Sequence, residues 1–206
     1  MNTAEWARQK GISDLNVIPA VADYNEPIAR SAAEIAQRIL ILQGTVAVAA
    51  GVDSGAVEKW FKSKGLWPSV TQNELTLFVP GEISQEERHN HVWHKEAELA
   101  LLWVLGLVES LGLPIRECDS RRMVDELMPA LGADIHQFVE SARLRTPGEI
   151  LVEDDRHYNL WCSFHQTRRC GEAVPSDLHP RVLFERQYAF EWLKGHDDWD
   201  HVQCDA

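Results

Sequence analysis

Six charged or aromatic residues stand among otherwise apolar positions, and they are the first candidates for chemistry. They are Arg38, Trp93, Glu96, Arg145, Glu149 and Arg186. A buried arginine or glutamate is unfavourable unless it is paired, because each ion loses its hydration. An arginine fork can also hold a carboxylate or a phosphate through parallel hydrogen bonds. Two roles are therefore open: the six residues line a pocket for a small anionic ligand, or they pair with one another and hold helices in register.

Histidines form a second candidate cluster, in which His89, His91 and His94 follow one another closely. On a helix, His91 and His94 share a face, and Glu87 lies one turn before His91 and can join them. Imidazole and carboxylate groups bind zinc, but a zinc site needs several ligands held by further hydrogen bonds. We expect a solvated helix face here rather than a metal site.

A third group with metal-ligand chemistry contains His157, Cys162, His165 and Cys170. Thiolate and imidazole suit zinc, but Cys162 falls on an apolar helix face, where a free cysteine is often a small core residue. His165 lies near the expected end of a helix, where basic side chains favour the helix dipole. We therefore expect no metal ion and no cofactor.

Catalytic sequence motifs are absent. The segment Gly51-Val52-Asp53-Ser54-Gly55 lacks the spacing of a nucleophile elbow. There is no Walker loop, no dinucleotide fingerprint and no H-E-x-x-H pair. Glu153, Asp154 and Asp155 form an acidic helical turn that we expect to be solvated. An enzyme is still compatible with the sequence, because carboxylate pairs can meet only in three dimensions.

Helix-start signals recur along the chain. Four capping boxes, in which a serine or threonine precedes a glutamate by three residues, occur at Ser31–Glu34, Thr71–Glu74, Ser84–Glu87 and Thr146–Glu149. The hydroxyl and the carboxylate of such a box satisfy two backbone N–H groups of the first helical turn. Strand signals are nearly absent, and the apolar run Leu75–Val79 follows a capping box, so we predict helix there.

The longest predicted helix runs from about Ser84 to Ser110. Its second half, Glu96 to Val108, is apolar all round, which places it at the centre of the domain. The predicted fold is all-α, a single-domain bundle of roughly eight to ten helices around this central apolar helix. The domain covers residues 1–206, with an N-terminal helix and a connecting loop over residues 1–29.

Short motifs along the chain resemble those of one bacterial family. They are Glu34-Ile35-Ala36 with Arg38, Trp93 with Glu96-Ala97, Leu102–Gly106, Leu113-Pro114, Cys118-Asp119, Leu144-Arg145, Glu149–Leu151, Tyr158 with Trp161, Glu185-Arg186, Ala189-Phe190, Trp192-Leu193 and Trp199-Asp200. On these residues the chain resembles the family catalogued as domain of unknown function 4272, from about residue 8 onwards and best over residues 30–205. The resemblance implies a helical fold and no established activity.

The composition restricts the classes of molecule that the protein can bind. The formal net charge is -12, from 32 acidic and 20 basic side chains. This balance disfavours nucleic acid, which needs clustered basic residues, and leaves room for a basic protein partner or a cationic ligand. The longest uncharged stretches fall short of the ~20 residues that span a bilayer, so we expect no membrane association. Four cysteines without a signal segment suggest reduced thiols in the cytoplasm.

Two function classes remain open. The first is a non-catalytic binding or interaction protein of the bacterial cytoplasm, for example an antagonist of a basic protein that an acidic surface would attract. The second is a small-molecule enzyme or sensor with a pocket lined by Arg145, Arg186, Glu96 and Trp93. A flat acidic face beside exposed tryptophans would favour the first class, and a deep pocket containing those four residues would favour the second. The sequence indicates no oligomeric state.

Overall fold

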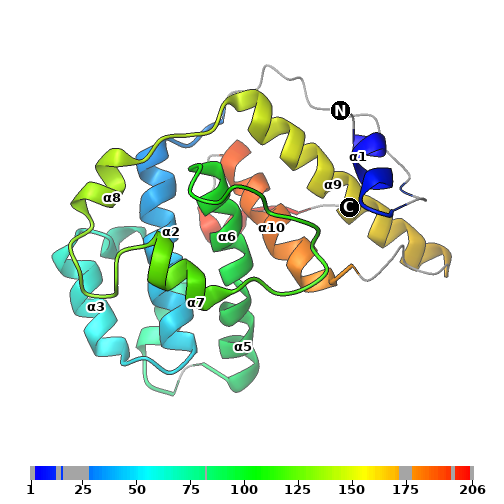
Figure 1. Cartoon of the computed structure of the whole chain (residues 1–206). Helices are drawn as coiled ribbons and strands as arrows, with labels where there is room; N and C mark the ends of the chain where they lie inside the picture. Colours follow the sequence, from blue (N-terminus) through cyan, green and yellow to red (C-terminus); the bar gives the residue numbers. More distant parts are fainter. Residues whose placement is uncertain are drawn as a thin grey trace.

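Helices and their connecting loops make up the described part of the chain (Figure 1). The computed structural model describes residues 3–12, 15, 28–81, 83–171, 178–195 and 198–204, and no strand occurs among them. The longer helices are α1 (Thr3–Gln9), α2 (Ala32–Ala49), α3 (Ser54–Ser63), α5 (Gln85–Trp93), α6 (Lys95–Val104), α9 (Pro147–Cys170) and α10 (Pro180–Lys194). The shorter elements are η1 (Trp67–Ser69), α4 (Gln72–Leu75), η2 (Thr76–Phe78), α7 (Ser120–Arg122), the π-helical turn η3 (Met123–Leu127), α8 (His136–Ser141) and η4 (Trp199–His201). The prediction of an all-α fold is confirmed.

The predicted helix starts are confirmed by their hydrogen bonds. Ser31, Thr71, Ser84 and Thr146 are the N-caps of α2, α4, α5 and α9, and each forms a complete capping box with the glutamate three residues later. The run Leu75–Val79 is helical, as predicted, because η2 continues directly from α4. Local side-chain chemistry therefore determines where these helices begin.

Helix α6 lies at the centre of the packing, against α2 on one side and α10 on the other. Its residues Ala97, Ala100, Leu101 and Leu102 have no exposed surface. This confirms the predicted central apolar helix, but with different bounds.

The prediction of one long helix from Ser84 to Ser110 is wrong. The helix is interrupted at His94, which follows the last residue of α5 and precedes the first residue of α6. Helix α6 then stops at Val104, because Gly106 takes a positive φ of 75° and its N–H donates to the carbonyl of Trp103. The N–H of Leu107 donates to the carbonyl of Leu102, which completes a Schellman motif. The signal in the sequence is Gly106, which lies inside the predicted helix.

Helix α2 is buried on two sides. Ile35, Ile39 and Leu42 join the core that contains α6 and α10, while Leu40 and Ile41 join a second core with α3. By length and composition α2 is the one described helix that could cross a membrane, and 61% of that window is buried inside the protein. Burial on both sides accounts for its apolar composition.

Helix α9 is the longest described helix, and α1 and α10 pack on it (Figure 1). The expectation that its acidic turn is solvated is wrong, because Glu153 and Asp154 are each only 7% exposed. Arg156 pairs with Glu153 at 2.8 Å, and Lys194 of α10 pairs with Asp154 at 3.2 Å. Both carboxylates therefore form ion pairs with basic side chains, because a buried carboxylate is unfavourable without a partner.

Candidate functional site

The two buried arginines among the six candidates each have a glutamate partner inside the protein. Arg186 donates from Nε and Nη2 to Oε2 of Glu96, at 3.2 and 3.0 Å, and from Nη1 to the carbonyl of Leu111 at 3.0 Å. Arg38 donates to Glu74, with which it forms a buried ion pair. All three nitrogen atoms of Arg186 thus donate to protein groups, as expected of a structural role.

Arg145 and Glu149 hold the ends of helices. Arg145 donates to the carbonyls of Trp103 and Val108, both at 2.7 Å, and so satisfies acceptors at the C-terminal end of α6. Its guanidinium lies 4.7 Å from the Trp103 ring centroid. Glu149 closes the capping box of α9 and lies 3.5 Å from Arg145. Both residues thus have structural contacts.

The six candidates do not converge on one site. Trp93 donates from Nε1 to Nε2 of His89 at 3.1 Å, and its ring packs on His179. Among the six, contacts between described residues join only Glu96 with Arg186 and Arg145 with Glu149. Of the six candidates, only Arg186 is among the residues that line a hollow of about 880 Å³ along the loop of residues 107–119. The contacts found are those expected of the structural role, and ligand binding by these residues stays a prediction.

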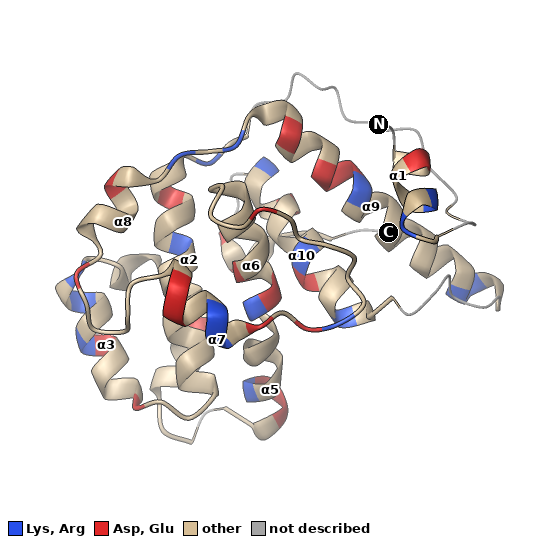
Figure 2. Ribbon diagram, in the orientation of Figure 1, with Lys and Arg blue, Asp and Glu red and all other residues tan. Residues whose placement is uncertain are grey.

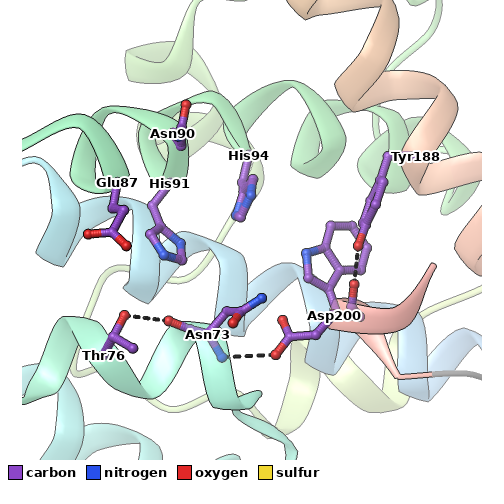
Figure 3. A pocket seen from close by; sticks show the side chains of 9 residues that line it. Asn73, Thr76, Glu87, Asn90, His91, His94, Tyr188 and Asp200 are labelled. Carbon is purple, nitrogen blue, oxygen red and sulfur yellow. Dashed lines mark hydrogen bonds between the residues drawn. The ribbon is translucent and has the colours of Figure 1, made fainter. Parts of the chain in front are cut away.

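A different set of polar residues does converge, in a pocket of about 330 Å³ that we call the histidine pocket (Figure 3). Its lining residues come from α4, η2, α5, α10 and η4, and from the junction at His94: Asn73, Thr76, Glu87, Asn90, His91, His94, Tyr188, Trp199 and Asp200. The Ser84 cap fixes the phase of α5, so that Glu87 and His91 point to the same side. The site therefore joins segments far apart in the sequence.

The two imidazoles of this pocket lie side by side. The ring centroids of His91 and His94 are 5.1 Å apart with an interplanar angle of 74°. His91 is 8% exposed, and the His94 ring packs against Trp199. The Nδ1 atoms of both histidines are buried and have no hydrogen-bond partner among the described residues. The expectation of a solvated helix face is therefore wrong for these two residues.

Burial keeps both imidazoles neutral near pH 7. Desolvation lowers the pKa of His91, although the carboxylates of Glu74, Asp200 and Glu87 oppose this shift. Desolvation, together with the charges of His91, Arg38 and Arg181, lowers the pKa of His94 to about 3. A proton added to either ring would put a charge in a poorly hydrated position, so the pocket contains two uncharged imidazoles.

Two carboxylates at the pocket have unfilled hydrogen-bonding capacity. Oε2 of Glu87 accepts the Ser84 N–H at 2.8 Å, and Oδ2 of Asp200 accepts the Asn73 N–H at 2.8 Å. The hydrogen bonds from Ser84 lower the pKa of Glu87, which keeps it ionised. The other oxygen of each carboxylate has no partner among the described residues, and neither Lys nor Arg is among those that line the pocket. The pocket is therefore locally anionic.

No described group of three or more His, Cys, Asp or Glu side chains is placed to hold a metal ion. The histidine pocket contains imidazole and carboxylate groups, but no three of its described side chains are placed to hold one ion. In the second cluster, Cys170 is exposed while His157 is buried, with its Nδ1 at 3.0 Å from the Glu153 carbonyl.

Sequence reasoning missed Asn73, Tyr188 and Asp200 as site residues. The Thr71–Glu74 box marked a helix start, but nothing in it shows that Glu74 also pairs with Arg38 or that Asn73 faces Asp200. The bond from Asn73 to Asp200 links positions 127 apart in the chain. The available signal was the Ser84 cap, which places Glu87, His91 and His94 on successive turns of one face.

The tryptophans do not form an exposed surface, because none of those in the described chain is exposed. The polar features gather instead in the histidine pocket. No curated protein and no solved structure matches this chain. The family model described as Domain of unknown function (DUF4272) matches residues 2–202 of the 206-residue chain, which therefore belongs to that family.

Proposed function

We propose that this is a non-catalytic binding protein of the bacterial cytoplasm that recognises a positively charged group, and that the histidine pocket receives this group. The observation that carries the proposal is the pair of carboxylates at Glu87 and Asp200, each with an unfilled oxygen, in a pocket that no Lys or Arg of the described chain lines. A cation with N–H donors satisfies both the charge and the hydrogen bonds of such a site.

The charges around the pocket support this proposal. Arg38 lies over the Trp199 ring at 5.2 Å, but Glu74 balances its charge. Arg181, whose charge acts on His94, lies 2.9 Å from the carboxyl group of Glu185. The carboxylates of Glu87 and Asp200 form no ion pair with a basic side chain among the described residues. The formal net charge of -12 would attract a basic protein or a small cation from a distance, and would repel nucleic acid.

Binding without catalysis is favoured by the state of the hydroxyl groups. The Thr76 hydroxyl donates to the Asn73 carbonyl at 2.6 Å, and the Tyr188 hydroxyl donates to the Trp199 carbonyl. No cysteine is among the lining residues. Among the described residues, the two neutral imidazoles thus have no free hydroxyl or thiol side chain beside them to activate. The alternative class, a small-molecule enzyme or sensor, stays a prediction, and so does a small anionic ligand.

The test is a titration of the full chain with ethylammonium and methylguanidinium chloride, with sodium acetate as the opposite charge. We expect both cations to bind and acetate not to bind. Glu87→Gln keeps the capping box, because glutamine serves there as well, and Asp200→Asn keeps an acceptor for Asn73. The double variant should weaken cation binding about tenfold.

The matched control is Glu86→Gln, which removes the neighbouring charge on α5 outside the lining of the pocket. It should change the affinity less than about twofold, since Glu86 is not among the residues that line the pocket. Equal affinity of the double variant and the unmodified chain would contradict the proposal, as would preferential binding of acetate.

A further inference from the structure

We infer that the histidine pocket recognises an ammonium group attached next to a carbonyl, the arrangement at the free N-terminus of a peptide and in an amino acid. This rests on the proposed function, whose cation it specifies. Its basis is that hydrogen-bond donors and acceptors lie together in the pocket: two imidazoles whose buried nitrogens lack partners, and two carboxylates.

The buried Nδ1 atoms determine where the imidazole protons are. Neutral imidazole carries one N–H and one lone pair. A proton on Nδ1 of His91 or His94 would be an N–H without an acceptor in the interior, because no described group lies within hydrogen-bonding reach. Orphaned buried N–H groups are rarer in proteins than under-used acceptors. We therefore place the proton of each ring on Nε2.

This tautomer makes the imidazoles donors toward the pocket. Because Nδ1 of each ring is buried, Nε2 is the nitrogen that a ligand in the pocket can reach. The unfilled oxygens of Glu87 and Asp200 accept, so the site offers both kinds of group within about 330 Å³. A ligand that fills both must present N–H donors with positive charge and an acceptor oxygen close by.

The ammonium–carbonyl pair meets these requirements. An alkylammonium ion fills the carboxylates and leaves the imidazole N–H groups unpaired, while a neutral amide does the reverse. His91 is 8% exposed, so an unpaired N–H on its ring is poorly hydrated and weakens binding, which makes such a site selective. The amide side chains of Asn73 and Asn90 can donate or accept and add to either half.

Three small probes of similar size separate the two halves of the recognition. Glycinamide has the ammonium and the carbonyl, ethylammonium has only the cation, and N-acetylglycinamide has only the amide groups. In titrations of the full chain at neutral pH, we expect glycinamide to bind about tenfold or more tightly than either of the others. Equal binding of glycinamide and ethylammonium would overturn the inference but leave the proposed function in place. Absence of binding by either cation would overturn both.

Variants at His91 assign the selectivity. His91→Phe keeps a ring and removes the N–H, so it should lower the ratio of glycinamide affinity to ethylammonium affinity to about one. His91→Gln, which keeps an N–H donor, should retain most of the preference and guards against a folding defect in the first variant. Asp200→Asn should weaken both cations by the same factor. A glycinamide preference that survives His91→Phe would overturn the role of His91.

The source of the group is decided by two further probes. Tighter binding of triglycine amide than of glycine would assign the N-terminus of a peptide, and the reverse order would assign a free amino acid. Either order supports recognition of ammonium beside carbonyl. Failure of both to bind where ethylammonium does would overturn it.

Discussion

At the residue scale, the buried charges divide into pairs that stabilise the fold and carboxylates left over for a ligand. Glu96 and Arg186 belong to the first kind, since both are almost fully buried and pair across α6 and α10. Glu87 and Asp200 belong to the second, because each has an oxygen without a partner among the described residues. The sequence identified the first kind and missed Asp200, since only three-dimensional contacts reveal whether a charge is balanced.

Breaking the buried pair should be costly. Arg186→Met leaves Glu96 without its partner in the core, and we expect the free energy of unfolding in urea to fall by about 3–5 kcal/mol. Adding Glu96→Leu to this variant should restore part of the loss, because the uncompensated charge is then gone. A loss below about 1 kcal/mol for Arg186→Met would show that this ion pair does not stabilise the packing of α6 on α10.

His94 should make stability depend on pH. Its pKa is lowered to about 3 in the folded chain, so between that pH and about 6.5 the unfolded chain binds the extra proton. The free energy of unfolding should therefore fall with decreasing pH in this window, by up to about 1.4 kcal/mol per pH unit. His94→Phe should reduce the slope of the curve below pH 6.5, while the other buried histidines keep their contribution.

Glu185 acts in the opposite direction and provides the control. Burial raises its pKa to about 7, so its contribution to stability is present at acidic pH and is lost as the pH rises from about 4.5 to 7. Glu185→Gln should remove that loss and leave the His94 effect intact. Parallel pH curves for the unmodified chain and His94→Phe would contradict the assignment of a neutral, buried His94.

At the element scale, helix starts could be predicted and helix interruptions could not. Four capping boxes predicted the starts of α2, α4, α5 and α9, because a cap is a contact between residues close in sequence. The break at His94 has no cap by a side chain. The capping boxes also place Glu87, His91 and Asn73, so this part of the pocket follows from local sequence, whereas its meeting with η4 does not.

The packing of α2 on α3 gives a test at this scale. A Cβ at Gly44 would lie 2.3 Å from Cζ of Phe61 and 2.9 Å from Cγ1 of Val57. We expect Gly44→Ala to destabilise the chain by about 1–3 kcal/mol, although alanine favours a helix by about 1 kcal/mol. Gly148→Ala in α9 is the matched control, since its Cβ meets nothing within 4 Å. Equal denaturant midpoints for the two variants would contradict this packing.

At the scale of the whole molecule, acidic and basic positions are spread over most of the helices in the view of Figure 2. The net charge alone does not locate a binding site. The composition predicts a binding protein, but it does not indicate where on the surface the ligand binds. The fold supplies the place, because α5, α10 and η4 bring the leftover carboxylates to one pocket. Cation binding there should weaken as salt is raised, since surface charges are screened within about 8 Å at physiological ionic strength.

Cation binding in the histidine pocket is tested most directly by a two-dimensional amide NMR titration of the ¹⁵N-labelled full chain with ethylammonium chloride, with sodium acetate as reference. We expect saturable shifts at His91, His94 and Asp200 and at the Trp199 indole N–H, with little change at the loop of residues 107–119. Shifts confined to that loop, or the same shifts with acetate, would contradict it.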